Sequence, residues 1–227
     1  MIRRRSFLTH LGAGVTAAGA AMTAGVSIAP AQSTGNGRWA PARHTQDDWF
    51  DQIPGKHRLL FDTSTAQGFG EALRFANTFL EANRDYGLND TDLAVVIVAR
   101  HQSTGFAYNE AIWSKYGQLI TRRTSLNDPK TKQSPTVNLY NATGYGNTLL
   151  NNGATVDSLV KRGVHLAVCN RATHGLADLV ATESGHDAGQ IYEEFIANLF
   201  GNAHIVPAGI VAVNRAQERG YSFAHAV

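Results

Sequence analysis

The sequence predicts an α/β fold, with a doubly wound, mainly parallel sheet and helices on both faces. A continuous apolar, β-branched run at 92–99 has the pattern of a central parallel strand that is buried on both sides. Strand-like segments alternate with amphipathic helical segments along much of the chain. The length of 227 residues suits one compact domain. The formal net charge of +2 is too small to argue for nucleic-acid binding.

The first half of the domain supplies, in order, a strand at 57–63, a helix at about 66–86, the strand at 92–99 and a helix at about 108–119. Phe69, Leu73 and Leu80 fall on one face of the first helix, and Gly87 suits its C-terminal end. These elements predict a β-α-β-α opening.

A polar segment at about 121–153 follows, rich in Asn, Thr, Gly and Pro and with little periodicity. A segment of this length is uncommon inside a compact domain. It is expected to be a lid, a binding loop or an oligomer contact, or else an insertion without a function.

The second half supplies, in order, a helix at 156–162, a strand at 164–169, a helix from Asn170 to about 180, a helix at about 187–200, a strand at 203–206, a helix at 210–219 and an edge strand at 221–224. Ile191, Phe195 and Leu199 have the i, i+4, i+8 spacing of a buried helix face. Pro207 is tolerated because it precedes a helix.

The first residues have the pattern of a Tat export signal. Arg4 and Arg5 form a twin-arginine pair, a weakly apolar run at 11–29 follows, and cleavage is expected after Ala31. The alternative is a membrane anchor, but the run is poorly hydrophobic. We therefore expect an exported, periplasmic mature chain with no membrane span, a polar linker at 32–55 that ends by packing on the domain, and the domain at 56–227.

Cys169 is the only cysteine in the chain, so no intrachain disulfide can form. It stands where a predicted strand runs into a helix, where unpaired backbone N–H groups and the helix dipole favour a thiolate. Asn170 is available to cap that helix, and His174 lies one turn further on. The alternative is a buried thiol that packs as a small hydrophobe.

Arg100 and His101 follow the buried strand at 92–99 directly. Parallel strands deliver their carboxyl ends to one edge of a sheet, so these side chains are expected to converge with Cys169 and with Asp62. A cationic neighbour there would stabilise a thiolate or an anionic substrate. The alternative is that both residues only solvate a strand end.

We expect neither a metal nor an organic cofactor, although the nine histidines leave metal binding as an alternative, with His101, His165, His174, His186 and His204 as candidate ligands. The histidines do not have helical i, i+4 ligand spacing, and there is no C-x-x-C pair. The residues after the first strand lack a dinucleotide-binding glycine pattern, and no G-x-S-x-G motif is present.

Three segments carry a family resemblance: 168–170 (Val-Cys-Asn), 206–210 (Val-Pro-Ala-Gly-Ile) and 217–223 (Gln-Glu-Arg-Gly-Tyr-Ser-Phe). From roughly Lys56 to the last residue, apart from the polar insertion, the chain resembles the DsrE/DsrF-like family of small α/β proteins. Arg100-His101 and 113–117 (Trp-Ser-Lys-Tyr-Gly) resemble an exported branch of that family. The resemblance implies a flavodoxin-like fold, assembly into trimers or hexamers, and relay of sulfane sulfur as a persulfide on Cys169.

Two functional hypotheses follow. In the first, the chain is an exported sulfur carrier or sulfurtransferase-like protein that takes sulfur from a small sulfur-containing ligand or a donor protein. Cys169 and His101 would then be catalytic, and Arg100, Asn170 and His174 would bind the substrate. In the second, the chain is a non-catalytic module that binds a small ligand or serves assembly.

Overall fold

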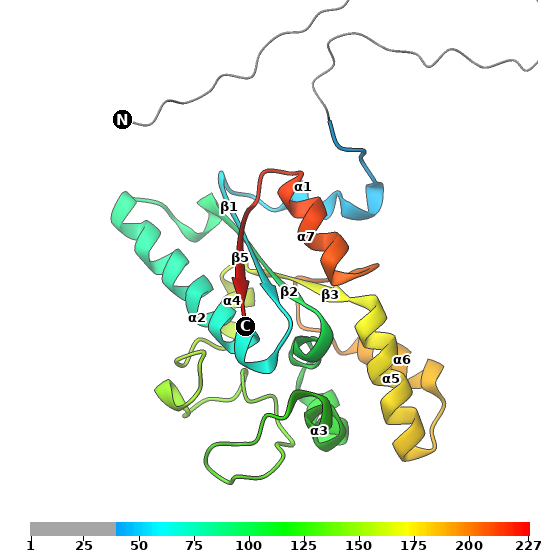
Figure 1. Ribbon diagram of the computed structural model, residues 1–227. Helices are drawn as coiled ribbons and strands as arrows, with labels where there is room; N and C mark the ends of the chain where they lie inside the picture. The colour runs from blue at the N-terminus through cyan, green and yellow to red at the C-terminus, as the bar shows by residue number, and fades with distance from the viewer. Residues whose placement is uncertain (1–39) are drawn as a thin grey trace, which may run out of the picture. The chain divides into compact units, whose positions relative to one another are not determined.

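The computed structural model describes residues 40–227, and one compact unit spans Pro41–Val227. The predicted Tat signal and the first part of the predicted linker lie outside the described residues. Five parallel strands form a single sheet in the order β4-β3-β2-β1-β5 (Figure 1). This is an α/β doubly wound, flavodoxin-like fold, as the sequence predicts.

The strands are β1 (His57–Thr63), β2 (Leu93–Ala99), β3 (His165–Cys169), β4 (Ala203–Val206) and β5 (Ser222–Ala226). β2 lies at the centre of the sheet, and all of its residues are buried, which explains its continuous apolar run. The chain moves across the sheet in one direction from β1 to β4 and then returns to place β5 on the other side of β1.

The α-helices are α1 (Trp49–Gln52), α2 (Ala66–Ala82), α3 (Glu110–Thr124), α4 (Val156–Lys161), α5 (Asn170–Ser184), α6 (Ala188–Ala197) and α7 (Gly209–Gln217). Successive side chains of β2 face opposite sides of the sheet. Val95 and Ile97 join the larger core with α2, α3 and α5, while Val96 and Val98 join the smaller core with α1 and α7. Helices therefore cover both faces.

Several helix ends differ from the sequence prediction, among them those of α2, α3 and α6. α2 stops at Ala82, and a 3-10 turn (Asn83–Tyr86) leads to Gly87, whose φ is +76°. α3 continues past the expected end to Thr124, because Ile120 and Thr121 are buried on the core side. The predicted helix at about 187–200 is shorter, and it ends at Ala197.

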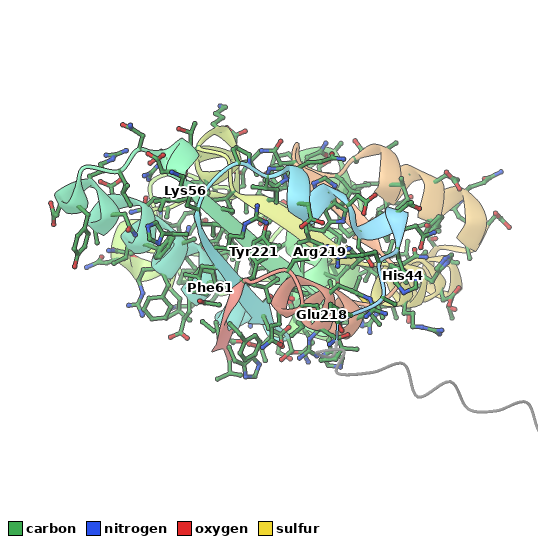
Figure 2. All side chains as sticks on the ribbon, turned by 90° about the horizontal axis from the view of Figure 1, so that it is seen from above. His44, Lys56, Phe61, Glu218, Arg219 and Tyr221 are labelled. Atoms are coloured by element: carbon green, nitrogen blue, oxygen red, sulfur yellow. The ribbon has the colours of Figure 1, made fainter. Side chains whose placement is uncertain are left out.

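The end of the predicted linker packs on the domain, and the compact unit that includes it begins at Pro41. Phe50 of α1 is fully buried in the smaller core. Its carbonyl oxygen accepts a hydrogen bond of 2.9 Å from the Tyr221 hydroxyl, and Arg219 Nε lies 3.1 Å from Asp51 Oδ2. Figure 2 shows Arg219 and Tyr221 next to the segment that runs from His44 to Lys56.

The polar insertion also packs on the domain. Asn138 is fully buried, and its side-chain amide donates to the carbonyl oxygens of Phe106 (3.1 Å) and Tyr108 (3.0 Å). The Tyr140 ring lies edge-on to Phe106, with the ring centroids 4.9 Å apart. Within residues 40–227, no helix combines the length and the apolar character needed to cross a membrane.

Candidate functional site

The carboxyl ends of β2, β3 and β4 meet at a cavity of about 290 Å³, called here the Cys169 pocket. It is lined by Arg100, His101, Arg123, Cys169, Arg171, Ala172, Ala208, Gly209 and Ile210. The structure thus brings together the predicted residues Arg100, His101 and Cys169. No residue of the polar insertion after α3 is among the lining residues that the structure describes.

Cys169 is the last residue of β3 and occupies the N-cap position of α5. It is 7% exposed and pairs in register with Val206 of β4. The Thr173 hydroxyl donates to the Cys169 carbonyl oxygen (3.1 Å) and also lies 2.8 Å from the buried Tyr108 hydroxyl. These contacts fix the backbone of the cysteine, and the residue forms part of the pocket wall.

Arg100 is held by Asp62 of β1, which the sequence predicts at the same carboxyl edge of the sheet. Arg100 Nε and Nη2 lie 2.7 Å from Asp62 Oδ1 and Oδ2, respectively. These hydrogen bonds raise the pKa of Arg100, with a smaller contribution from Cys169, although partial burial opposes the rise. A Cβ added at Gly209 would lie 2.6 Å from Arg100 Cβ, so the glycine allows the arginine to pack against α7.

Arg123 and Arg171 were not predicted from the sequence. Arg123 lies in the last turn of α3, and its Nη1 is 3.5 Å from the place where a Cβ on Gly175 of α5 would stand. Arg171 lies in the first turn of α5 and is exposed. Neither forms a salt bridge with any residue in 40–227. Two cationic side chains without a carboxylate partner therefore line the pocket.

The first turns of α5 and α7 both open onto the pocket, and neither helix has a side-chain cap there. By contrast, α2, α3, α4 and α6 are capped by the side chains of Thr65, Asn109, Thr155 and Asp187. The first backbone N–H groups of a helix lack intrahelical partners and carry partial positive charge. The pocket is therefore positive from its backbone as well as from its arginines.

His101 has a left-handed backbone, with φ of +56°, which is uncommon for a residue other than glycine. Its Nδ1 lies 3.3 Å from the Ser64 carbonyl oxygen. A proton on Nδ1 would be donated to that oxygen, which would leave Nε2 as the proton acceptor. The side chain is exposed and lines the same pocket as Cys169.

Asn170 and His174 are not among the residues that line the Cys169 pocket, so the structure does not place them with Arg100, His101 and Cys169. Asn170 is the first residue of α5 and not its N-cap, and its Oδ1 accepts a hydrogen bond of 2.9 Å from the Tyr192 hydroxyl. The His174 ring is stacked on Tyr192, with centroids 4.1 Å apart. Both side chains therefore face α6, because a spacing of four residues keeps them on the same side of α5.

A pair of histidines, His165 and His204, lies outside the pocket. His165 Nδ1 of β3 lies 2.9 Å from His204 Nε2 of β4, and Trp49 is stacked on His204 with centroids 3.9 Å apart. Burial, and then the neighbouring His165, lower the pKa of His204 to about 4. Residues 40–227 contain no group of three or more His, Cys, Asp or Glu side chains placed to hold a metal ion.

Comparison with known proteins assigns no family to the chain. No family model matches the sequence. No curated protein matches it either. A solved structure, that of the protein of unknown function MTH1491 from Methanobacterium thermoautotrophicum, is similar over 75% of this chain and 99% of that chain, with 12% identity and a TM-score of 0.38. A similarity of this size supports no conclusion about function.

Proposed function

We propose that the protein is a DsrE/DsrF-like sulfur carrier in which Cys169 accepts sulfane sulfur as a persulfide. The observation that carries the proposal is the position of Cys169, the only cysteine in the sequence, in the wall of a positively charged pocket at the carboxyl edge of the sheet. A thiolate is the nucleophilic form of cysteine, and nearby cationic groups and a helix N-terminus favour it.

The proposed step begins with loss of the Cys169 proton to His101 Nε2 or to solvent. The thiolate then attacks the terminal sulfur of a persulfide or polysulfide donor. A new S–S bond forms on Cys169, the S–S bond of the donor breaks, and the remaining donor leaves with the electron pair as a thiolate or shortened polysulfide. One sulfur atom moves and no external oxidant is required.

Mass spectrometry after incubation with inorganic polysulfide tests this step. Wild-type protein is expected to gain the mass of one sulfur atom at Cys169, and the adduct should disappear on reduction. Cys169→Ser should gain nothing, and His101→Gln should load about a hundredfold more slowly if the imidazole accepts the proton. Absence of the adduct on wild-type protein, under conditions that load a known persulfide carrier, would contradict the proposal.

A non-catalytic ligand-binding module is the second candidate, and the low exposure of Cys169 favours it, because a thiol that is only 7% exposed also fits a structural role. In that case Cys169→Ser would keep ligand binding and physiological function. A strain that carries Cys169→Ser in place of the wild-type gene would distinguish the two candidates.

We further propose Tat export and assembly into trimers or hexamers. The export proposal rests on Arg4, Arg5 and the run that follows them, and the assembly proposal rests on the family resemblance. Replacement of both arginines by lysine should block export, which fractionation of cells would show. Light scattering of the purified protein would measure its mass in solution.

A further inference from the structure

We infer that the Cys169 pocket recognises a sulfur donor with a sulfur oxyanion group, such as thiosulfate or a small organic S-sulfonate, and that Arg123 and Arg171 bind this group. The binding of the anion can be tested by itself. Only the subsequent transfer of sulfur rests on the proposed function.

The charge of the pocket is the first argument. Three arginines line it, and one of them, Arg100, is neutralised by its bidentate contact with Asp62. Two positive charges remain, those of Arg123 and Arg171. None of the described lining residues is acidic. A neutral donor would leave both charges unused, whereas an anion would satisfy them.

The size and shape of the pocket are the second argument. A cavity of about 290 Å³ lies just below the usual range for ligand sites, roughly 300–1,000 Å³, and suits a small ligand. Guanidinium groups and open helix N-termini are both suited to the several oxygen atoms of a tetrahedral oxyanion. Ala172, Ala208 and Ile210 add an apolar wall that could hold the organic part of an S-sulfonate.

The chemistry of the step is the third argument. The Cys169 thiolate attacks the outer sulfur of thiosulfate, the S–S bond of thiosulfate breaks, and sulfite leaves with the electron pair. Cys169 retains the outer sulfur as a persulfide anion, so atoms and charge balance without an oxidant. An anionic nucleophile must approach a dianion here, and the resulting repulsion is reduced if Arg123 and Arg171 hold the oxygen atoms.

Calorimetric titration of the full chain with thiosulfate tests the binding in a Cys169→Ser background, where no transfer can occur. Thiosulfate should bind at low ionic strength, and sulfate should displace it because both carry the oxyanion. Adding Arg123→Gln or Arg171→Gln should weaken binding about tenfold or more, through loss of a charge-assisted hydrogen bond. The matched control is Arg122→Gln, since Arg122 precedes Arg123 in α3 but is paired with Glu183. It should change affinity less than about twofold.

The inference is overturned if thiosulfate does not bind, if sulfate does not displace it, or if Arg123→Gln and Arg171→Gln bind as tightly as the parent. These outcomes are independent of the polysulfide experiment, so either proposal can fail alone. A rate comparison adds a further test with Cys169 intact. Arg123→Gln should slow loading from thiosulfate about tenfold more than it slows the reaction of Cys169 with neutral dimethyl trisulfide, which forms a methyl mixed disulfide and releases methyl persulfide anion. An equal loss with both donors would contradict oxyanion recognition.

Discussion

Arginine side chains have different surroundings at the two ends of the sheet. Near the amino end, Arg162 is fully engaged: its guanidinium contacts Asp90 (2.7 and 3.1 Å), Glu81 (2.9 Å) and Asn77 (2.8 Å). In the Cys169 pocket, Arg123 and Arg171 have no carboxylate partner among residues 40–227. The first arrangement joins elements of the fold, and the second leaves binding capacity for a ligand.

Arg100 combines both roles, because it lines the pocket and is bound to Asp62. Its surroundings resemble those of Arg162 more than those of Arg123. The comparison therefore predicts that Arg100 and Arg162 contribute mainly to stability, while Arg123 contributes mainly to binding. The Asp62, Arg162 and Arg123 variants each test one part of this division.

Asp62→Asn should have the largest effect on stability. The Asp62 side chain is 5% exposed and that of Arg100 is 26% exposed, so the change leaves a partly buried guanidinium without its counter-ion. The free energy of unfolding is expected to fall by about 2–3 kcal/mol, somewhat less than for a fully buried pair. Urea denaturation measures this. The exposed pair of Asp157 and Lys161 is the control, and Asp157→Asn should cost about 0.5 kcal/mol or less. An equal cost for both would refute a special role for Asp62.

Arg162→Gln should lower the free energy of unfolding by about 1–2 kcal/mol, because it removes charge-assisted hydrogen bonds at a residue that is 20% exposed. Arg162 lowers the pKa of Asp90 below its usual 3.8. This stabilisation is complete above pH 3.8, the usual pKa, and is lost as the pH falls through the lower pKa of the folded state. The acid-induced loss should therefore be smaller in Arg162→Gln, whereas thiosulfate binding should stay unchanged. A fall in affinity would contradict the separation of the two ends.

The His165–His204 pair should make the protein less stable in acid. Burial lowers the pKa of His204 from 6.5 to about 4, so the folded state favours the neutral ring. The resulting stabilisation is complete above pH 6.5 and is lost as the pH falls from 6.5 to about 4. We expect about 1 kcal/mol, discounted because the ring is only half-buried. Trp49, stacked on His204, is a fluorescence probe for denaturation at each pH. His204→Gln should flatten the profile, and an unchanged slope would assign it to other groups.

Arg123→Gln should have the smallest effect on stability, about 0.5 kcal/mol or less, because the side chain forms no salt bridge within the described residues. Its effect should be confined to thiosulfate affinity. Thermal unfolding with and without thiosulfate separates the two, since a bound ligand raises Tm only in a variant that binds it. A large loss of stability without ligand would show that Arg123 belongs to the fold, as Arg162 does.

The fold could be predicted from the sequence because β2 is buried on both faces, and a strand buried on both faces has an unbroken apolar sequence. It also placed Cys169, Arg100 and His101 correctly at one edge, since each ends or follows a parallel strand. The order of strands could not be read in the same way. It depends on how the long connections cross the sheet, and local residue patterns do not record this.

Arg123 was missed because the end of α3 was placed too early. Thr121 and Thr124 look like loop residues in the sequence, but both are buried, and the helix ends only at Thr124, before the C-cap Ser125, whose φ is +53°. Asn170 and His174 were misplaced because proximity to Cys169 along the chain was taken as proximity to the pocket. Their side chains instead point to Tyr192, a contact that depends on how α6 packs on α5.

The close approach of Gly209 to Arg100 couples the Arg100–Asp62 ion pair to the free volume of the pocket. The space where a side chain would begin at position 209 is already filled by the aliphatic part of the arginine. A methyl group there would have to displace the aliphatic part of Arg100, so we expect Gly209→Ala to weaken the ion pair with Asp62 and to change the free volume of the pocket. We therefore expect substitutions to be tolerated less well at this glycine than at Arg123 or Arg171.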